Sequence, residues 1–213
     1  MITTLNALLV VVLLINLFVL GSSRISALIQ AVAVQGVVLG VMPLLAHGHL
    51  SLLPALLAIA TVLVKGSLIP QMLGKALRDA HIKREIEPIV GFMPSTLLGA
   101  LGTAAAIGLA AKLPLAEGHA QTLIVPAALS TVFTGFLLLT TRIKAITQAI
   151  GYLVLENGIF IFGLLLIEAV PLLVELGVLL DLFVGVFVIS IIIHHINREF
   201  ASLDTRRLSA LKE

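Results

Sequence analysis

The sequence predicts an all-α protein of the membrane: a polytopic helical bundle with about seven transmembrane helices. Of its 213 residues, 60% are hydrophobic and only 11% are charged, whereas about 25% of residues are charged in an ordinary soluble domain. The mean hydropathy is +1.20. A soluble protein cannot bury this much apolar surface, but a bilayer removes the difficulty because the surrounding solvent is itself apolar.

Seven stretches reach the length of about 20 mainly apolar residues that a membrane span needs. They cover approximately residues 4–21, 25–46, 50–73, 89–111, 121–141, 145–167 and 171–196. No basic residue precedes the first apolar run, as one normally does in a secretory signal. We therefore interpret the first stretch as a retained helix.

The basic residues divide unequally between the two ends of these spans. The chain has 13 Lys and Arg residues. One, Lys65, lies inside the third span, and Lys112 alone falls on one side. The other eleven fall on the opposite side: Arg24, Lys75, Arg78, Lys83, Arg84, Arg142, Lys144, Arg198, Arg206, Arg207 and Lys212. The positive-inside rule then predicts an N-terminus outside the cell and a cytoplasmic C-terminus.

This pattern divides the chain into five parts. We expect three transmembrane helices in residues 1–74, followed by a polar cytoplasmic segment, 75–88, that forms a short surface helix. Residues 89–120 hold the fourth helix and an outer loop, residues 121–196 form a three-helix bundle, and residues 197–213 form a cytoplasmic tail.

Composition argues against redox or bond-making chemistry on this chain. There is no cysteine, which excludes disulfides and thiolate-held iron–sulfur or nickel sites. The histidines are His47 and His49 in a loop, the isolated His81 and His119, and the adjacent His194 and His195, and none has a convincing metal-binding spacing. We therefore expect no metal, cofactor or active site here, and the net charge of +2 does not suggest nucleic acid.

Two acids lie deep inside the predicted spans, where an ionisable group costs about 2.5–3.5 kcal/mol. Glu156 is twelve residues after Lys144, about 18 Å of helix rise, and Asp181 is ten residues after Pro171, about 15 Å. Because their helices run antiparallel, the two carboxyl groups reach similar depths near the midplane and can lie close together. They are either a proton-accepting pair, with the neighbouring Asn157 on the same path, or protonated acids that only bond neighbouring helices.

Other polar groups in the spans are open to two interpretations. Lys65, about 12 Å from the expected cytoplasmic end of its span, either snorkels to the interface or is an internal cation. Pro70, five residues later, can loosen the helix and admit water. His194 and His195 at the inner mouth of the last span either take up protons or anchor the helix at the interface.

The last third of the chain resembles a known family. Gly151-Tyr152-Leu153-Val154-Leu155-Glu156-Asn157-Gly158, Glu175-Leu176-Gly177, Asp181 and the tail from Ser202 to Lys212 resemble the membrane component E of hydrogenase-4-type complexes. These are group 4 hydrogenases related to formate hydrogenlyase. The last three helices more distantly resemble the K subunit of respiratory complex I. Here Asp181 replaces that subunit's glutamate, and Glu156 lies three residues beyond the other glutamate position, which Leu153 occupies.

The resemblance implies an integral subunit of a complex I-like, membrane-bound hydrogenase in a bacterial or archaeal cytoplasmic (inner) membrane. Its buried acids would serve proton translocation within a hetero-oligomer. The implied partners are antiporter-like and other membrane-arm subunits and a soluble redox arm, whose subunits would carry a nickel–iron site and iron–sulfur clusters. The alternatives are a structural adaptor that docks antiporter-like subunits, and a component of a multisubunit cation/proton antiporter without a redox arm.

Overall fold

The computed structural model describes residues 2–46, 52–79, 86, 88–114, 122–166 and 170–201. These residues form helices and short connections, and no strand occurs among them. The helices are α1 (Ile2–Gly21), α2 (Ile25–Ala46), α3 (Leu52–Leu63), the π-helical turn η1 (Val64–Leu68), α4 (Ile69–Asp79), α5 (Phe92–Ala110), α6 (Ile124–Thr141), α7 (Ala145–Gly163) and α8 (Pro171–Ala201).

The prediction of seven transmembrane helices is confirmed. The described residues contain seven segments that are long and apolar enough to cross a bilayer, and α3, η1 and α4 together make the third. They are Thr3–Gly21, Ile25–Leu45, Ala55–Arg78, Phe92–Ala110, Ile124–Thr141, Ala145–Gly163 and Leu176–His194. The largest difference from the expected boundaries is in the third span, which continues beyond residue 73.

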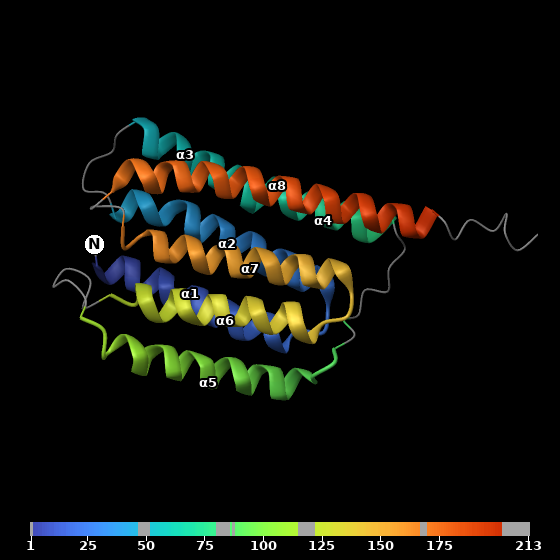
Figure 1. Ribbon diagram of the computed structural model, residues 1–213, viewed down its shortest axis with the longest axis horizontal. Coiled ribbons are helices and arrows are strands. Elements are labelled where there is room, and N and C mark those ends of the chain that lie inside the picture. The colour runs from blue at the N-terminus through green and yellow to red at the C-terminus, as the bar shows by residue number, and fades with distance from the viewer. Residues whose placement is uncertain are drawn as a thin grey trace, which may run out of the picture.

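The spans stack in successive rows, as Figure 1 shows. The third span lies beside α8 at one edge, α2 beside α7 in the next row, α1 beside α6 in the third, and α5 alone at the opposite edge. Contacts of α2 with the third span and of α7 with α8 join the first two rows. Residues far apart in the sequence therefore meet between the rows.

Glycines allow the closest helix pairs to approach at backbone distance, as small residues do in membrane bundles. A Cβ atom added to Gly135 of α6 would lie 2.5 Å from the backbone nitrogen of Leu155 in α7. A Cβ atom on Gly36 of α2 would lie 2.7 Å from the Cβ atom of Lys65. These contacts fix the positions of α7 and η1, the two elements that carry most of the buried charge.

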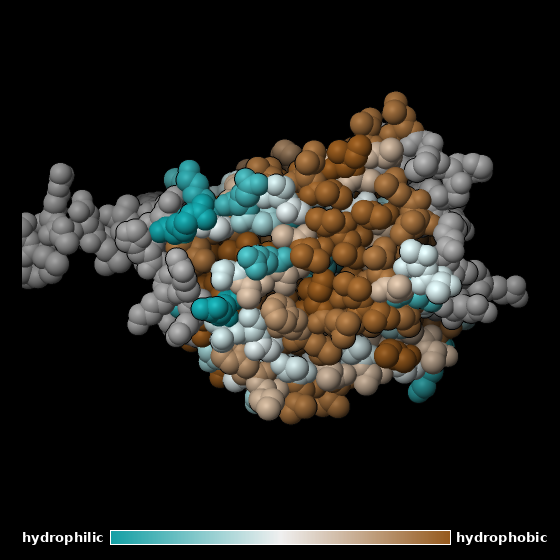
Figure 2. All heavy atoms as spheres, turned by 180° about the vertical axis from the view of Figure 1, so that it is seen from behind, coloured by the Kyte–Doolittle hydropathy of each residue, from teal (hydrophilic) through white to brown (hydrophobic). Residues whose placement is uncertain are grey.

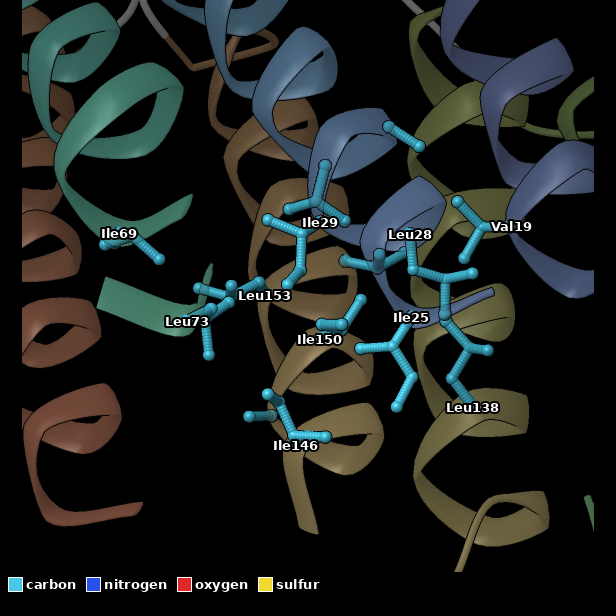
Figure 3. Close-up of a cluster of buried hydrophobic side chains, with 14 of the residues drawn as sticks. Val19, Ile25, Leu28, Ile29, Ile69, Leu73, Leu138, Ile146, Ile150 and Leu153 are labelled. Atoms are coloured by element: carbon cyan, nitrogen blue, oxygen red, sulfur yellow. The ribbon is translucent and has the colours of Figure 1, made fainter. Parts of the chain in front are cut away.

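A cluster of buried aliphatic side chains fills the bundle between its middle and the end where α8 finishes. It draws on six spans, and Figure 3 shows side chains of α2, α4 and α7 turned toward one another. Its fully buried members include Ile25, Leu28, Ile69, Leu73 and Ile150. This packing fills the bundle between the buried polar groups and the end where α8 finishes.

The polar and apolar parts of the surface are separated along the helices. In Figure 2 apolar side chains cover the middle of the visible face, and hydrophilic ones gather toward the end where α8 finishes. Arg24, Lys75, Arg78, Arg142 and Lys144 all stand on helices or connections at this end. This grouping fits the division of basic residues on which the orientation prediction depends.

The expected surface helix in residues 75–88 is only partly described. Residues 75–79 belong to α4, which continues the third span to Asp79. Residues 80–85 and 87 lie outside the described part, as do His47, His49, His81, His119 and the tail from residue 202.

Candidate functional site

Lys65 lies on the π-helical turn η1, in the middle of the third span. The backbone N–H of Ile69 bonds the carbonyl of Val64, five residues back, and such π turns in α-helices often mark functional positions. Pro70 lies two residues after this turn. Proline has no N–H and its ring crowds the preceding turn of a helix. The π turn is therefore the local loosening of the helix that Pro70 leads us to expect.

The ammonium group of Lys65 is buried against carboxylates of two other helices. Lys65 is 4% exposed. Its Nζ lies 2.5 Å from Oδ2 of Asp181 on α8 and 3.8 Å from Oε2 of Glu156 on α7. The Phe160 ring of α7 lies beneath the same nitrogen, 5.7 Å from it to the ring centroid. Lys65 thus faces protein, and the snorkelling interpretation is wrong.

Two distances explain why Lys65 does not snorkel. The helix continues to Asp79 rather than ending near residue 73, so Lys65 lies fourteen residues, or about 21 Å of helix rise, from that end. A lysine side chain is too short to span this distance, and the two carboxyl groups provide a nearer partner.

Glu156 is the least satisfied member of this group. Its side chain is 6% exposed, and within the described residues neither carboxyl oxygen has a hydrogen-bond partner. Gly185 on α8 makes room for it, because a Cβ atom there would lie 3.2 Å from Oε1 of Glu156. Gly185 is one turn beyond Asp181, so α8 presents both a carboxyl group and a gap to α7.

The charges of this group do not balance when every member is ionised. One ammonium and two carboxylates leave a net charge of −1, which is costly at this depth. One additional proton, held by either carboxyl group, makes the cluster neutral. We call Lys65, Glu156 and Asp181 the charge cluster.

A chain of hydrogen bonds leads from the charge cluster across two further rows of helices. Lys65 Nζ donates to Oδ1 of Asn157 at 3.3 Å, and Nδ2 of Asn157 donates to Oε1 of Gln35 in α2 at 3.2 Å. Nε2 of Gln35 donates to Oδ1 of Asn16 in α1 at 3.1 Å. Nδ2 of Asn16 donates to the hydroxyl of Thr131 in α6 at 2.8 Å.

The structure therefore brings together four of the six residues that the sequence suggested. Glu156 and Asp181 lie on adjacent helices as expected, Lys65 joins them, and Asn157 contacts Lys65. His194 is exposed near the end of α8, far along that helix from Asp181, and the side chain of His195 lies outside the described part. No group of three or more potential His, Cys, Asp or Glu metal ligands occurs in the described ranges.

Asn16, Gln35 and Thr131 were not predicted from the sequence. All three are buried, with exposed fractions of 1%, 0% and 0%. The signal was present, because amide side chains in the interior of apolar spans need partners just as the acids do. Asn16 and Gln35 are neutral, however, and a neutral amide in an apolar span stands out less than an ionisable group does.

A second buried cation, Arg142, lies between α6 and α7, at the end of the bundle where α8 finishes. It is 1% exposed, and its Nη1 and Nη2 donate to the carbonyls of Val90 at 3.1 Å and Leu20 at 2.9 Å. Its Cζ lies 5.1 Å from the Phe92 ring centroid. Burial lowers the pKa of this guanidinium from its ordinary value, yet an arginine remains protonated at neutral pH.

Comparison with known proteins gives one match over nearly the whole chain and a second over half of it. The chain is 34% identical over 190 residues to the uncharacterized protein Rv0085 of Mycobacterium tuberculosis, covering 88% of this chain and 86% of that protein. It is 35% identical over 101 residues to hydrogenase-4 component E of Escherichia coli, covering 47% of this chain and 46% of that component. The same values hold for the Shigella flexneri component E.

Comparison with protein-family profiles and comparison with solved structures give no match. No protein-family profile matches the chain, and no solved structure matches it. The likeness to component E agrees with the resemblance inferred from the sequence, whereas the likeness to the complex I K subunit is not supported by a match.

Proposed function

The chain belongs to the same family as the mycobacterial protein Rv0085, and we propose that it is an integral subunit of a complex I-like membrane-bound hydrogenase or related oxidoreductase. Within that complex, its charge cluster takes up and releases protons. The support for the complex is the match to hydrogenase-4 component E over 101 residues, together with seven apolar helices. The support for the proton role is the cluster itself.

The observation that carries the proton role is the carboxyl group of Glu156, which has no hydrogen-bond partner among the described residues, beside the Lys65–Asp181 ion pair. A buried carboxylate without a donor is strongly disfavoured. Protonated, the same group is neutral and can donate to the neighbouring carboxylate, so one proton is held between Glu156 and Asp181 at rest. A change of charge in a neighbouring subunit then decides whether this proton stays or leaves.

The redox reaction itself is assigned to other subunits. A soluble arm with a nickel–iron site and iron–sulfur clusters, as in a formate hydrogenlyase, would transfer the electrons. Antiporter-like membrane subunits would exchange protons with the charge cluster. We also propose that the N-terminus lies outside the cell and the C-terminus in the cytoplasm of a bacterium or archaeon, since the basic residues gather at one end.

Purification of the tagged chain in a mild detergent tests the assignment to a complex. The proposal expects hydrogenase-type and antiporter-like subunits to co-purify with it. Antiporter-like subunits without any redox subunit would instead support a cation/proton antiporter, and a chain that purifies alone from membranes where those subunits are present would contradict the proposal.

Replacement of both acids tests the proton role. Glu156→Gln with Asp181→Asn keeps the side-chain shapes and allows hydrogen bonding, but an amide does not exchange a proton usefully near pH 7. Proton translocation by the assembled complex in liposomes should be lost, while redox turnover in detergent persists in part. Glu175→Gln, six residues before Asp181 toward the outer end of α8, is the matched control. Normal translocation by the double variant would leave a structural adaptor as the better account.

A further inference from the structure

In the hydrogen-bond chain beyond the charge cluster, the order of donors and acceptors is fixed. The groups at both ends of the chain impose this order. The Thr131 hydroxyl donates to the Ala127 carbonyl at 2.6 Å, so its oxygen is left to accept from Asn16. At the other end an ammonium can only donate, so Asn157 must offer Lys65 its carbonyl oxygen. Each amide between them accepts on one side and donates on the other.

Reversal of any one amide would break this order. If Gln35 turned over, two NH2 groups would face each other on one side and two carbonyl oxygens on the other. If Asn16 turned over, its NH2 group would face that of Gln35, and its carbonyl oxygen would face the Thr131 oxygen, whose proton is donated to Ala127. The side chains are buried, so no bulk water would relieve the mismatch, and an unpaired buried polar group costs about 1–3 kcal/mol. The Thr131 anchor therefore selects the orientation of Asn157, which lies three hydrogen bonds away.

We propose that Thr131, Asn16 and Gln35 are positioning residues that act through Asn157 to hold the ammonium group of Lys65 between the two acids. This inference rests on the proposed function, because it assigns a purpose to the groups surrounding the same cluster. It also separates Asn157 from the acids: Asn157 orients Lys65 and does not carry the proton, because amide groups cannot relay protons as carboxyl groups do.

The positions of the helices make this arrangement useful. The chain crosses from α6 and α1 through α2 and α7 to η1, and so ties all three paired rows of the bundle to one lysine. The π turn gives Lys65 a backbone position of its own, and Gly36 lets α2 approach it. Without a fixed hydrogen-bond acceptor, the long side chain of Lys65 can adopt several rotamers. The carbonyl oxygen of Asn157 is such an acceptor, and it sets the distance of the ammonium group from both acids.

A double-mutant cycle on the full chain in lipid vesicles tests the proposal. Infrared difference spectra follow the carboxyl stretching band of Glu156 and Asp181 against pH, with Glu156→Gln and Asp181→Asn used to assign it. Among the described residues, the titratable groups that face this pair are Lys65 on η1 and Tyr152, one turn before Glu156 on α7. Neither is altered in the cycle.

The cycle combines Thr131→Val with Asn157→Leu. Thr131→Val should shift the midpoint of the band in the same direction as Asn157→Leu, and it should add no shift in a chain that already carries Asn157→Leu. Thr131→Ser should restore the original midpoint. Thr140→Val is the matched control, because the hydroxyl of Thr140 is exposed on α6 and bonds carbonyls of its own helix.

Two results would overturn the proposal: an unchanged midpoint in Thr131→Val, or an equal shift with and without Asn157→Leu. Gln35→Met replaces Asn157→Leu as the second background should that variant not accumulate. The readout depends on protonation of the acids alone. A failure of the cycle is thus distinguishable from a failure of the proposed function, which the translocation measurement reports.

Discussion

Within the part of the chain that the structure describes, the bundle buries two cations, and their partners differ in kind. Arg142, at the end of the bundle where α8 finishes, donates to the backbone carbonyls of Leu20 and Val90, which have no second charge state. Lys65, in the middle of the third span, pairs with Glu156 and Asp181, which do. Burial of a charge is therefore not itself a sign of function, and the distinguishing feature is whether its partners can change protonation.

This comparison predicts that the loss of Lys65 has the largest effect. Lys65→Met leaves two acids without a cation, and breaking a buried pair in this way costs about 3–5 kcal/mol, less when both acids become protonated. Both proton translocation in liposomes and stability to thermal unfolding in detergent should fall. Lys75→Met, at an exposed position ten residues later on α4, is the control and should change neither. Unchanged translocation in Lys65→Met would remove the distinction between the two cations.

Arg142 should show the opposite profile. Arg142→Met removes two charge-assisted hydrogen bonds and leaves two carbonyls without that donor, so we expect a loss of about 2–3 kcal/mol in the free energy of unfolding. The proton-to-electron ratio of the complexes that do assemble should remain normal. Arg24→Met, at an exposed position near the same end, should have little effect on either quantity. A lowered ratio in Arg142→Met would mean that Arg142 also takes part in coupling.

The smallest expected effect concerns the position of Lys65 rather than its charge. In Gly36→Ala the new Cβ atom would meet the Cβ and backbone of Lys65 at 2.7 and 2.9 Å, so η1 must move away from α2. Overpacking of this kind costs about 1–2 kcal/mol, and translocation should weaken in proportion to the displacement of Lys65. Gly108→Ala in α5 is the control, because its Cβ atom would meet nothing within 4 Å. Equal effects of the two substitutions would contradict the close packing of α2 against η1.

The sequence predicted the spans and the depth of the acids because both follow from distance along a helix. Glu156 lies twelve residues after Lys144, and Asp181 lies ten residues after Pro171. These separations correctly predicted that the two acids lie at a similar height along their helices, where both contact Lys65. Depth alone does not say which spans are neighbours or which way a side chain turns. Lys65 pairs with Asn157, which lies 92 positions later in the sequence, and with Asp181, which lies 116 positions later. These contacts therefore depend on the packing of the third span beside α8, which the sequence does not give.

Other features depended on boundaries and residue types that sequence patterns do not resolve. Hydropathy ends the third span near residue 73, which gives Lys65 too shallow a position and leaves snorkelling as an option. Pro70 indicates that the helix is loosened near it. That the loosened part takes the form of a π turn before the proline depends on packing, which the sequence does not show. The amide chain was predictable in part, since Asn16 and Gln35 stand inside apolar spans, although their partners were not.

The most direct test of the central claim is proton translocation by a complex that carries Glu156→Gln alone. This variant keeps the Lys65–Asp181 ion pair, the side-chain volume and the neutral charge of the resting cluster, and it removes only the exchangeable proton. The account predicts that the chain folds and assembles normally while the number of protons translocated per electron pair in liposomes falls sharply. A normal ratio in this variant would contradict the account and make the charge cluster, like Arg142, a purely structural contact.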